Sequence, residues 1–505
     1  MKNITTVLEY HDRTKHRPSR YAASLGYMDW ATQPNPFRRY EGTELIPLKL
    51  NTITPPYHLL FGEDLPSAPL CLESVSQLLR YALGLAAWKS HSGSRWALRC
   101  NASSGNLQPS ECYILAPALE GISDHPTLSH YAPNEHALEI LHQFDTPLKI
   151  ENDTILIALS SIFWREAWKY GERCWRYCQL DAGHAYQAIK ISAAALGWEC
   201  TILSVDSGEI GHLCGLDQLR RFDPHELESP DMLLRLSLSS HEISDIDLPA
   251  VPPLDSRANL LSPSHHDWPI LEVIDTATQG LYPLTHPLTQ SRITPPPSKS
   301  AGEIILKRRS AQMMDGSSIT EEQFRRLLNA SLFCRETSDV HFALFVHRVE
   351  GLPKGLYTYV RNTSDLESLK QAMDTTFEWK DYGEGLYLLR EGDYRGAAQM
   401  ISCNQEIAKD GAFSFGMLCR FGESLETYGA IGYKNLYHQC GAIGQMLYLE
   451  ATSLGLSATG IGCFLDDEFH ALLGMHDLKY QSLYHFTIGR AIIDTRIMTL
   501  EPYTH

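Results

Sequence analysis

Two stretches far apart in the chain repeat one pattern, and this internal repeat is the feature that most constrains the fold. The first stretch runs from Asp181 to Trp198, and the second from Gln439 to Leu456. Around the second stretch, apolar residues recur every three or four positions, as on the buried face of a helix. Each stretch holds two glycines fourteen positions apart, namely Gly183 with Gly197 and Gly441 with Gly455. The repeat predicts one structural unit that is present twice.

A second pair of segments supports the duplication. Tyr113–Leu115 precedes Gly121, and Ala343–Phe345 precedes Gly351, as expected of a strand followed by a turn. Short β-rich runs and amphipathic helices occur in both halves, which predicts an α+β fold for each. Two facing copies in one chain would form an intrachain pseudo-dimer, with an interface where a ligand can bind.

The length of 505 residues also favours two domains, because single cores rarely grow beyond ~250–300 residues. A proline-rich stretch separates the two copies, and proline at this density neither continues a helix nor fits a central strand. We predict an N-terminal domain over residues 1–245, a linker or arm over 246–299, and a C-terminal domain over 300–505. The prolines of the linker are Pro249, Pro252, Pro253, Pro263, Pro269, Pro283, Pro287, Pro295, Pro296 and Pro297.

Composition excludes several classes of protein. The formal net charge is −17 and no cluster of Lys or Arg stands out, so neither a nucleic acid nor an anionic membrane is expected as a partner. No apolar run reaches the ~18 residues of a membrane span, and we expect a cytoplasmic location. The 12 cysteines lack the spacing of a disulfide framework and are expected to be reduced. Cys174 and Cys178 would share a helix face, but no further ligands complete a metal site.

Three segments are candidate ligand-binding sites. Arg308–Ser310 offers forked donors that match phosphate oxygens, or it is a solvated basic turn. Ala102–Pro109 is a polar loop that can present donors to a planar heterocycle, or it is an ordinary turn. Gly460–Gly462 follows the second repeat, where glycines permit close approach of the backbone to a ligand. The first copy has Cys200–Ser204 at the corresponding place, without glycines.

Together these segments resemble the nitroreductase superfamily, which combines an arginine–serine motif, a serine–asparagine loop and a glycine-rich strand after a long central helix. Other segments resemble the double-domain SagB-type dehydrogenases within that superfamily, and the resemblance covers nearly the whole chain. These segments are His11–His16, Asp29 with Trp30, Arg95–Arg99, Trp164–Arg173, Gly462–Asp467 and Gln481–Phe486. The resemblance implies two tandem nitroreductase-like domains.

The resemblance also implies FMN bound where two copies meet. Its phosphate and ribityl end would contact Arg308, Arg309 and Ser310. Residues expected around the ring are Ser103, Ser104, Gly105, Asn106 and Gln108 of the first copy, and Gly460, Ile461 and Gly462 of the second. Arg490 or Arg496 would supply the remaining positive charge. Nitroreductases commonly carry a second cation where this chain has Gln312, so stabilisation of an anionic reduced flavin is expected to be weaker here.

The second site of a symmetric pair is not retained in the sequence. The repeat places Phe333–Glu336 where the first copy has Ser103–Asn106, and the first copy lacks the glycine strand. We therefore expect one FMN per chain, with NAD(P)H as a candidate reductant. Further association of chains stays open.

Lys169 and Tyr170 resemble the lysine–tyrosine pair of azoline dehydrogenases, in which a proton leaves the substrate as hydride passes to the flavin. A desolvated lysine can act as a base near neutral pH, and a tyrosine can relay a proton. The alternative is a surface lysine beside a half-buried tyrosine. His184 and His485 could face the same cavity, although a structural histidine is the commoner state.

The function implied by the resemblance is that of an FMN-dependent oxidoreductase, with hydride moving between a substrate and flavin N5. Candidate substrates are a thiazoline or oxazoline in a modified peptide, or a small electron-poor compound. The alternative is a degenerate nitroreductase-fold module that binds flavin or a peptide without turnover. Loss of the second site and the presence of Gln312 keep that alternative open.

Overall fold

The computed structural model describes residues 2–50, 53–61, 65–238, 247–289, 296 and 299–503. The chain divides into two compact units. Unit 1 comprises Met1–Ala23, Thr285–Pro296 and Lys307–Arg496, and unit 2 comprises Ser24–Leu284, Pro297–Leu306 and Ile497–His505. Pro295, Pro297 and the expected domain boundary at residues 245 and 246 lie outside the described residues.

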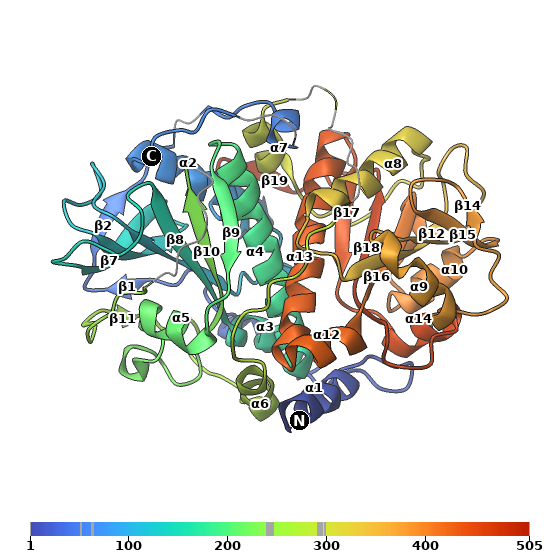
Figure 1. Ribbon diagram of the computed structural model, residues 1–505, viewed down its shortest axis with the longest axis horizontal. Helices are drawn as coiled ribbons and strands as arrows, with labels where there is room; N and C mark the ends of the chain where they lie inside the picture. The colour runs from blue at the N-terminus through green and yellow to red at the C-terminus, as the bar shows by residue number, and fades with distance from the viewer. Residues whose placement is uncertain are drawn as a thin grey trace. The chain divides into compact units, whose positions relative to one another are not determined.

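Unit 2 is built on a seven-stranded sheet in which every neighbouring pair of strands is antiparallel (Figure 1). In sheet order its strands are β2 (Glu44–Pro47), β7 (Ala137–Gln143), β6 (Thr127–Ala132), β5 (Ser110–Ala116), β8 (Thr154–Ile162), β10 (Glu228–Ser237) and β9 (Glu199–Leu203). Its helices include α2 (Leu72–Ala82), α3 (Phe163–Tyr170), α4 (Cys174–Ala194), α5 (Ser207–Cys214), α6 (Pro269–Ala277) and most of α7 (Ala301–Lys307). Two small sheets complete it, formed by β1 (Tyr40–Glu41) with β11 (Arg257–Ala258), and by β19 (Met498–Leu500), β3 (Leu85–His91) and β4 (Ser94–Arg99).

Unit 1 is built on a second seven-stranded antiparallel sheet. In sheet order its strands are β14 (Lys380–Asp381), β15 (Leu386–Glu391), β13 (Gly355–Tyr359), β12 (Val340–Val346), β16 (Phe413–Cys419), β18 (Gln481–Gly489) and β17 (Ser457–Ile461). Its helices include α1 (Lys2–Arg13), α8 (Glu321–Ala330), α9 (Leu366–Ala372), α10 (Arg395–Ile401), α11 (Ile407–Asp410), α12 (Phe421–Tyr428), α13 (Ile431–Ser453) and α14 (Asp466–Leu473).

Six strands of each sheet follow one topology, which confirms the duplication that the sequence predicts. The remaining edge strand differs, because β2 precedes the other six strands of its sheet in the chain, whereas β14 lies between β13 and β15. In each sheet the long helix, α4 or α13, connects the fifth strand of the sheet order to the strand at the far edge. Each long helix packs on strands of its own sheet (Figure 1). Gly197 and Gly455 follow these helices with φ of +68° and +70°, a left-handed conformation that ends a helix and favours glycine.

The long helices begin earlier than the repeated stretches indicated. Helix α4 begins at Cys174 rather than near Asp181, and α13 begins at Ile431 rather than near Gln439. Both added segments are buried like the rest, and neither contains proline, so nothing in them ends a helix. A helix that is buried on nearly all sides lacks the one-sided apolar pattern by which a helix start is recognised.

The stretch expected to be an extended arm contains regular structure. Helix α6 begins with Pro269 at its first helical position. A backbone N–H at this position makes no hydrogen bond within the helix, so proline, which has no N–H, is well tolerated there. None of the described helices is long and apolar enough to cross a membrane.

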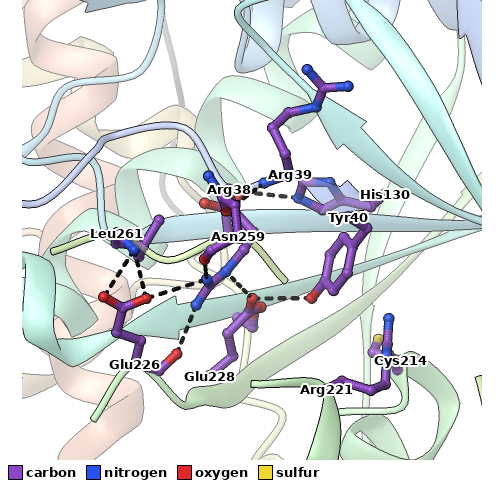
Figure 2. Close-up of polar contacts among 12 residues, drawn as sticks. Arg38, Arg39, Tyr40, His130, Cys214, Arg221, Glu226, Glu228, Asn259 and Leu261 are labelled. Carbon is purple, nitrogen blue, oxygen red and sulfur yellow. Dashed lines mark hydrogen bonds and ion pairs between the residues drawn. The ribbon is translucent and has the colours of Figure 1, made fainter. Parts of the chain in front are cut away.

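A network of buried charges crosses the sheet of unit 2 (Figure 2). Glu228 on β10 receives hydrogen bonds from Arg38 Nε (3.1 Å), Tyr113 Oη (2.6 Å) and Ser160 Oγ (2.9 Å). Arg38 also donates to the backbone oxygen of Glu226 at 2.7 Å. Because each charge has a partner, the cost of removing these groups from water is offset by charge-assisted hydrogen bonds.

His130 lies in the same network, between two carboxylates. Its ring nitrogens lie 3.0 Å from Glu111 and 2.9 Å from Glu139. Burial alone would lower the pKa of His130, but the hydrogen bonds to these carboxylates outweigh it and raise the pKa to about 9. Burial would raise the pKa of Glu111, but Arg165 and His130 lower it to about 2. The folded chain thus holds an imidazolium between two carboxylates.

Replacing His130 with Ala should destabilise the chain by ~3–5 kcal/mol near neutral pH, because Glu111 and Glu139 would lose a buried positive partner. The contribution of His130 is fully present below the ordinary imidazole pKa of 6.5 and is lost as pH rises through about 9. The difference in unfolding free energy between parent and variant, measured in urea, should therefore shrink over this interval. Arg496→Ala, which removes the ion pair of an exposed arginine with Asp494, should cost less than ~1 kcal/mol. A loss that is the same at both ends of the interval would contradict the assigned charge.

Candidate functional site

In unit 1, the structure brings the arginine–serine segment and the glycine strand side by side. Ser310 pairs in parallel with Ala458 of β17. The N–H of Ala311 donates to the carbonyl of Ala458 at 3.1 Å, and Thr459 Oγ1 donates to the carbonyl of Ala311 at 2.6 Å. The segment therefore extends the edge of the sheet at β17.

Tyr448 on α13 joins these two segments. Its hydroxyl accepts a hydrogen bond from the N–H of Gly460 at 2.8 Å and lies 2.9 Å from Ser310 Oγ. The buried guanidinium of Arg308 lies 5.2 Å from the centre of the Tyr448 ring, in the range of a cation–π contact. Tyr448 is not among the site residues predicted from the sequence. One feature of the sequence distinguishes this position. When the glycines of the two repeats are aligned, Tyr448 lies opposite Lys190, so the two matched helices differ there.

The side chain of Tyr484 explains why residue 460 is glycine. A Cβ atom at Gly460 would lie 1.9 Å from Tyr484 Oη, which is a severe overlap. The side chain of Ile461 is buried in the core of unit 1, so only its backbone is available to a ligand. Gly462 is half-buried. Close packing within the unit therefore accounts for Gly460 before any ligand is considered.

The structure separates the two candidate C-terminal arginines. The carbonyl of Arg490, directly after β18, accepts a hydrogen bond from the N–H of Asp315 at 2.9 Å, which holds it beside the segment that follows Ser310. Arg496 instead forms an ion pair with Asp494 at 2.7 Å. Gln312 is exposed between these segments. Arg309 is half-buried and donates to the carbonyl of Arg308 at 2.6 Å.

In unit 2, the predicted polar loop is held by its own hydrogen bonds. Ser103 Oγ accepts from the N–H of Gln108 at 2.8 Å, and Gln108 Nε2 donates to Asn106 Oδ1 at 3.0 Å. Asn106 and Gln108 have φ of +59° and +56°, a strained conformation for residues with side chains. The buried Oε1 of Gln108 has no hydrogen-bond partner among the described residues. Strain combined with an unsatisfied acceptor is typical of a functional loop.

Asp181 on α4 anchors this loop. Its carboxylate accepts hydrogen bonds from the N–H of Ser104 at 3.0 Å and from Ser104 Oγ at 2.9 Å. Burial raises the pKa of Asp181 to about 7, although hydrogen bonds from Ser103 and Ser104 oppose the shift. The anchor of the loop therefore changes charge near neutral pH.

The loop lies against Tyr170, one of the two candidate catalytic residues. A Cβ atom at Gly105 would lie 2.6 Å from Tyr170 Oη. Lys169 Nζ lies 5.1 Å from the centre of the Tyr170 ring, and both side chains are half-buried. The structure thus brings the polar loop and Tyr170 together within unit 2.

Glu166, one turn before Lys169 and Tyr170 on α3, is a buried carboxyl that the sequence analysis quoted but gave no role. Neither of its carboxyl oxygens has a hydrogen-bond partner in the part of the chain that the structure describes. Burial raises the pKa of Glu166 well above its usual range, Asp181 and Cys174 add to the shift, and Lys169 opposes it. Burial therefore favours the neutral form of the Glu166 carboxyl.

Arg165, next to Glu166, connects this helix to the loop and to the buried charges. Its guanidinium donates to the carbonyl of Gln108 at 2.8 Å, to the carbonyl of Asn35 at 3.0 Å, and to the carboxylate of Glu111. Of the two candidate histidines, His184 is buried in α4, and His485 is a packing residue that stacks on Phe464 at 4.1 Å and lies 3.0 Å from Ser482 Oγ.

Gly460→Ala should lower the free energy of unfolding by ~1–3 kcal/mol, because the new methyl group must displace Tyr484. Gly396→Ala is the matched control, since a Cβ atom there meets no atom within 4 Å, and it should cause no loss. Adding Tyr484→Phe to Gly460→Ala removes the hydroxyl that clashes and should restore part of the stability. Denaturant unfolding measures all three variants, and equal stability of the two alanine variants would refute the packing explanation.

Asp181→Asn should reveal the raised pKa of the carboxyl. The folded chain keeps the proton up to about pH 7, whereas the unfolded chain loses it near 3.8, so folding is penalised as pH rises between these values. Unfolding free energies measured across this interval should fall for the parent relative to the variant by on the order of 4 kcal/mol. Glu199→Gln, at an exposed carboxylate of the same unit, should show no such trend. A difference that stays constant with pH would show that Asp181 titrates normally.

Comparison with known proteins identifies the fold. The sequence profile of the Nitroreductase family matches residues 67–217 and 305–490, one stretch for each sheet and together more than half of the chain. The protein of Methanocaldococcus jannaschii named putative nitroreductase MJ1384 is 22% identical over 202 residues, which cover 38% of this chain and 90% of that protein.

Two solved structures illustrate the range of likeness. A putative nitroreductase from Anabaena variabilis aligns with 96% of this chain and 99% of its own, at 23% identity and a TM-score of 0.70, and thus shares the tandem fold. A chain of the E. coli microcin synthetase McbBCD complex, solved with truncated pro-MccB17 bound, aligns with 48% of this chain and 94% of its own. The identity is 19% and the TM-score is 0.27, so this likeness says nothing about substrate. With two tandem α+β domains of this fold, the chain belongs to the nitroreductase family.

Proposed function

We propose that this chain is an FMN-dependent oxidoreductase in which hydride moves between a substrate and flavin N5. The observation that carries the proposal is the position of Tyr170, whose hydroxyl lies against Gly105 in the loop expected to flank the flavin ring. Membership of the nitroreductase family supports oxidoreductase chemistry. The loop and the candidate proton-transfer residues are thus parts of one site in unit 2.

The residues present fit FMN. In unit 1, Arg308, Arg309 and Arg490 offer guanidinium groups, which match phosphate oxygens, and Ser310 offers a hydroxyl. In unit 2, the unsatisfied Oε1 of Gln108 is an acceptor for a ring N–H, and Asn106 adds a polar amide. When bound, FMN supplies the hydride acceptor or donor. The expectation of one FMN per chain stays a prediction.

We assign the proton-transfer work to Lys169 and Tyr170. A lysine accepts a proton only as the free amine, and a nearby carboxylate would favour the ammonium form. Burial favours the neutral form of the Glu166 carboxyl, which limits this effect. In this assignment Lys169 is the base, and the Tyr170 hydroxyl relays the proton.

The substrate class that best fits this pair is a thiazoline or oxazoline in a modified peptide, as in the SagB-type dehydrogenases that the sequence resembles. Oxidation of such a ring removes a proton from one carbon and a hydride from its neighbour, which requires a base beside the hydride acceptor. Lys169 and Tyr170 supply that base. A small electron-poor compound, reduced with electrons from NAD(P)H, is the other substrate considered.

The variants Lys169→Ala and Arg308→Ala test the proposal separately. Lys169→Ala should keep FMN but slow substrate-dependent bleaching of the flavin by ~10²-fold or more, because the base is lost. Lys169→Arg should be equally slow, since arginine stays protonated.

Arg308→Ala should lose FMN on gel filtration. Lys370→Ala, which removes a half-buried lysine paired with Glu367, is the control and should match the parent in both measurements.

The absorbance of the purified chain decides between the two functional classes. A flavin spectrum that bleaches without oxygen on addition of a thiazoline peptide or NAD(P)H supports turnover. A bound flavin that neither compound bleaches supports the module that binds without turnover. A colourless protein that cannot be reconstituted with FMN would overturn the proposal.

A further inference from the structure

Two cysteines of unit 1 bring their sulfur atoms unusually close together. Cys463 Sγ lies 2.8 Å from Cys403 Sγ. A disulfide bond is about 2.05 Å long, so the two sulfurs need to approach by only roughly 0.8 Å to bond. Both thiols are reduced in this structure.

The backbone holds the two cysteines at this spacing. Cys403 lies in the turn after α10, and Cys463 lies between β17 and α14. The N–H of Leu465 donates to the carbonyl of Ile401 at 2.7 Å, and Gln405 Nε2 donates to the carbonyl of Cys463 at 3.2 Å. The pairing of two segments therefore holds the two cysteines near each other.

Neither cysteine belongs to a helix or strand. Cys403 and Asn404 have φ of +54° and +61°, two consecutive left-handed residues that have side chains. Such a conformation persists only where the surroundings enforce it, and it marks functional turns. A second close pair, Cys419 and Cys440, has sulfurs 3.4 Å apart, and these residues lie within the regular elements β16 and α13.

Access to solvent also distinguishes the pair. Of the 12 cysteines, only Cys71, Cys403 and Cys463 are half-buried, and the other nine are buried. Exposure of a thiol governs its oxidation and its exchange with disulfides. Cys419 and Cys440 are both fully buried. The sulfur atoms of Cys403 and Cys463 are thus close together in residues that solvent reaches, whereas those of Cys419 and Cys440 are close together but buried.

We propose that Cys403 and Cys463 are a redox-active pair that exchanges with small disulfides of the glutathione class. One cysteine thiolate attacks the small disulfide, which forms a mixed disulfide and releases one small thiol. The second cysteine thiolate then displaces the other small thiol and closes the Cys403–Cys463 bond. The two protein thiols lose two electrons and two protons in total, and the small disulfide gains them. The new bond ties the chain that leaves Gly460–Gly462 to the turn after α10.

The test is peptide mapping of the native full-length chain after incubation with oxidised glutathione, followed by alkylation of the remaining thiols. We expect a linked peptide pair that contains Cys403 and Cys463, two hydrogens lighter than the sum of the reduced peptides and lost on treatment with dithiothreitol. The Cys419–Cys440 pair in the same digest is the internal control. It should link at least tenfold more slowly, because glutathione does not reach buried sulfurs.

Two single variants test whether the reaction passes through a mixed disulfide. In Cys463→Ser, the reaction should stop with glutathione attached to Cys403, and Cys403→Ser should trap the adduct on Cys463 in the same way. The proposal is overturned if both thiols of the native chain stay alkylatable, or if each accumulates its own glutathione adduct without a linked peptide. None of these measurements involves flavin, so the result is independent of the proposed oxidoreductase activity.

Discussion

The candidate site in unit 2 depends on one buried cation, the guanidinium of Arg165. This side chain is fully buried and bonds the carboxylate of Glu111, which in turn bonds His130. The same guanidinium holds the carbonyl of Gln108, at the end of the strained polar loop. A cation removed from water needs such partners, and their positions are fixed by the sheet. The charge pairing in the core therefore also sets where the loop and helix α3 lie.

Helix α3 then places two kinds of titratable group next to each other. Lys169 and Tyr170 are half-buried, while Glu166 is buried without a hydrogen-bond partner among the described residues. Asp181 completes the group from α4 and bonds the loop directly. Burial raises the pKa of Glu166 well above its usual range and raises the pKa of Asp181 to about 7. Perturbed carboxyl groups of this kind cluster at functional sites, which is why we assign proton transfer to this helix.

Duplication gave the chain two similar sheets, and divergence made their edge strands different. The glycine alignment of the repeats places Gly460 of β17 opposite Ile202 of β9, and Tyr448 of α13 opposite Lys190 of α4. In unit 1, Tyr448 and Tyr484 pack around Gly460, and Tyr448 also contacts Ser310. A side chain in place of Gly460 would overlap Tyr484, because a Cβ atom there would lie 1.9 Å from Tyr484 Oη. The arginine–serine segment is therefore joined to its edge strand by residues that only one copy carries.

The sequence by itself determined the duplication, the α+β class and the position of the polar segments, because spaced glycines and apolar periodicity are local signals. It did not reveal the start of either long helix, since a helix that is buried all round has no distinctive polar face. It also gave no role to Tyr448, Glu166 or Asp181. Their properties arise from contacts between residues far apart in the chain, such as Asp181 with Ser104 and Tyr448 with Ser310. Only the tertiary structure decided which carboxyl groups are buried, and burial in a medium of low dielectric constant is what shifts their pKa values.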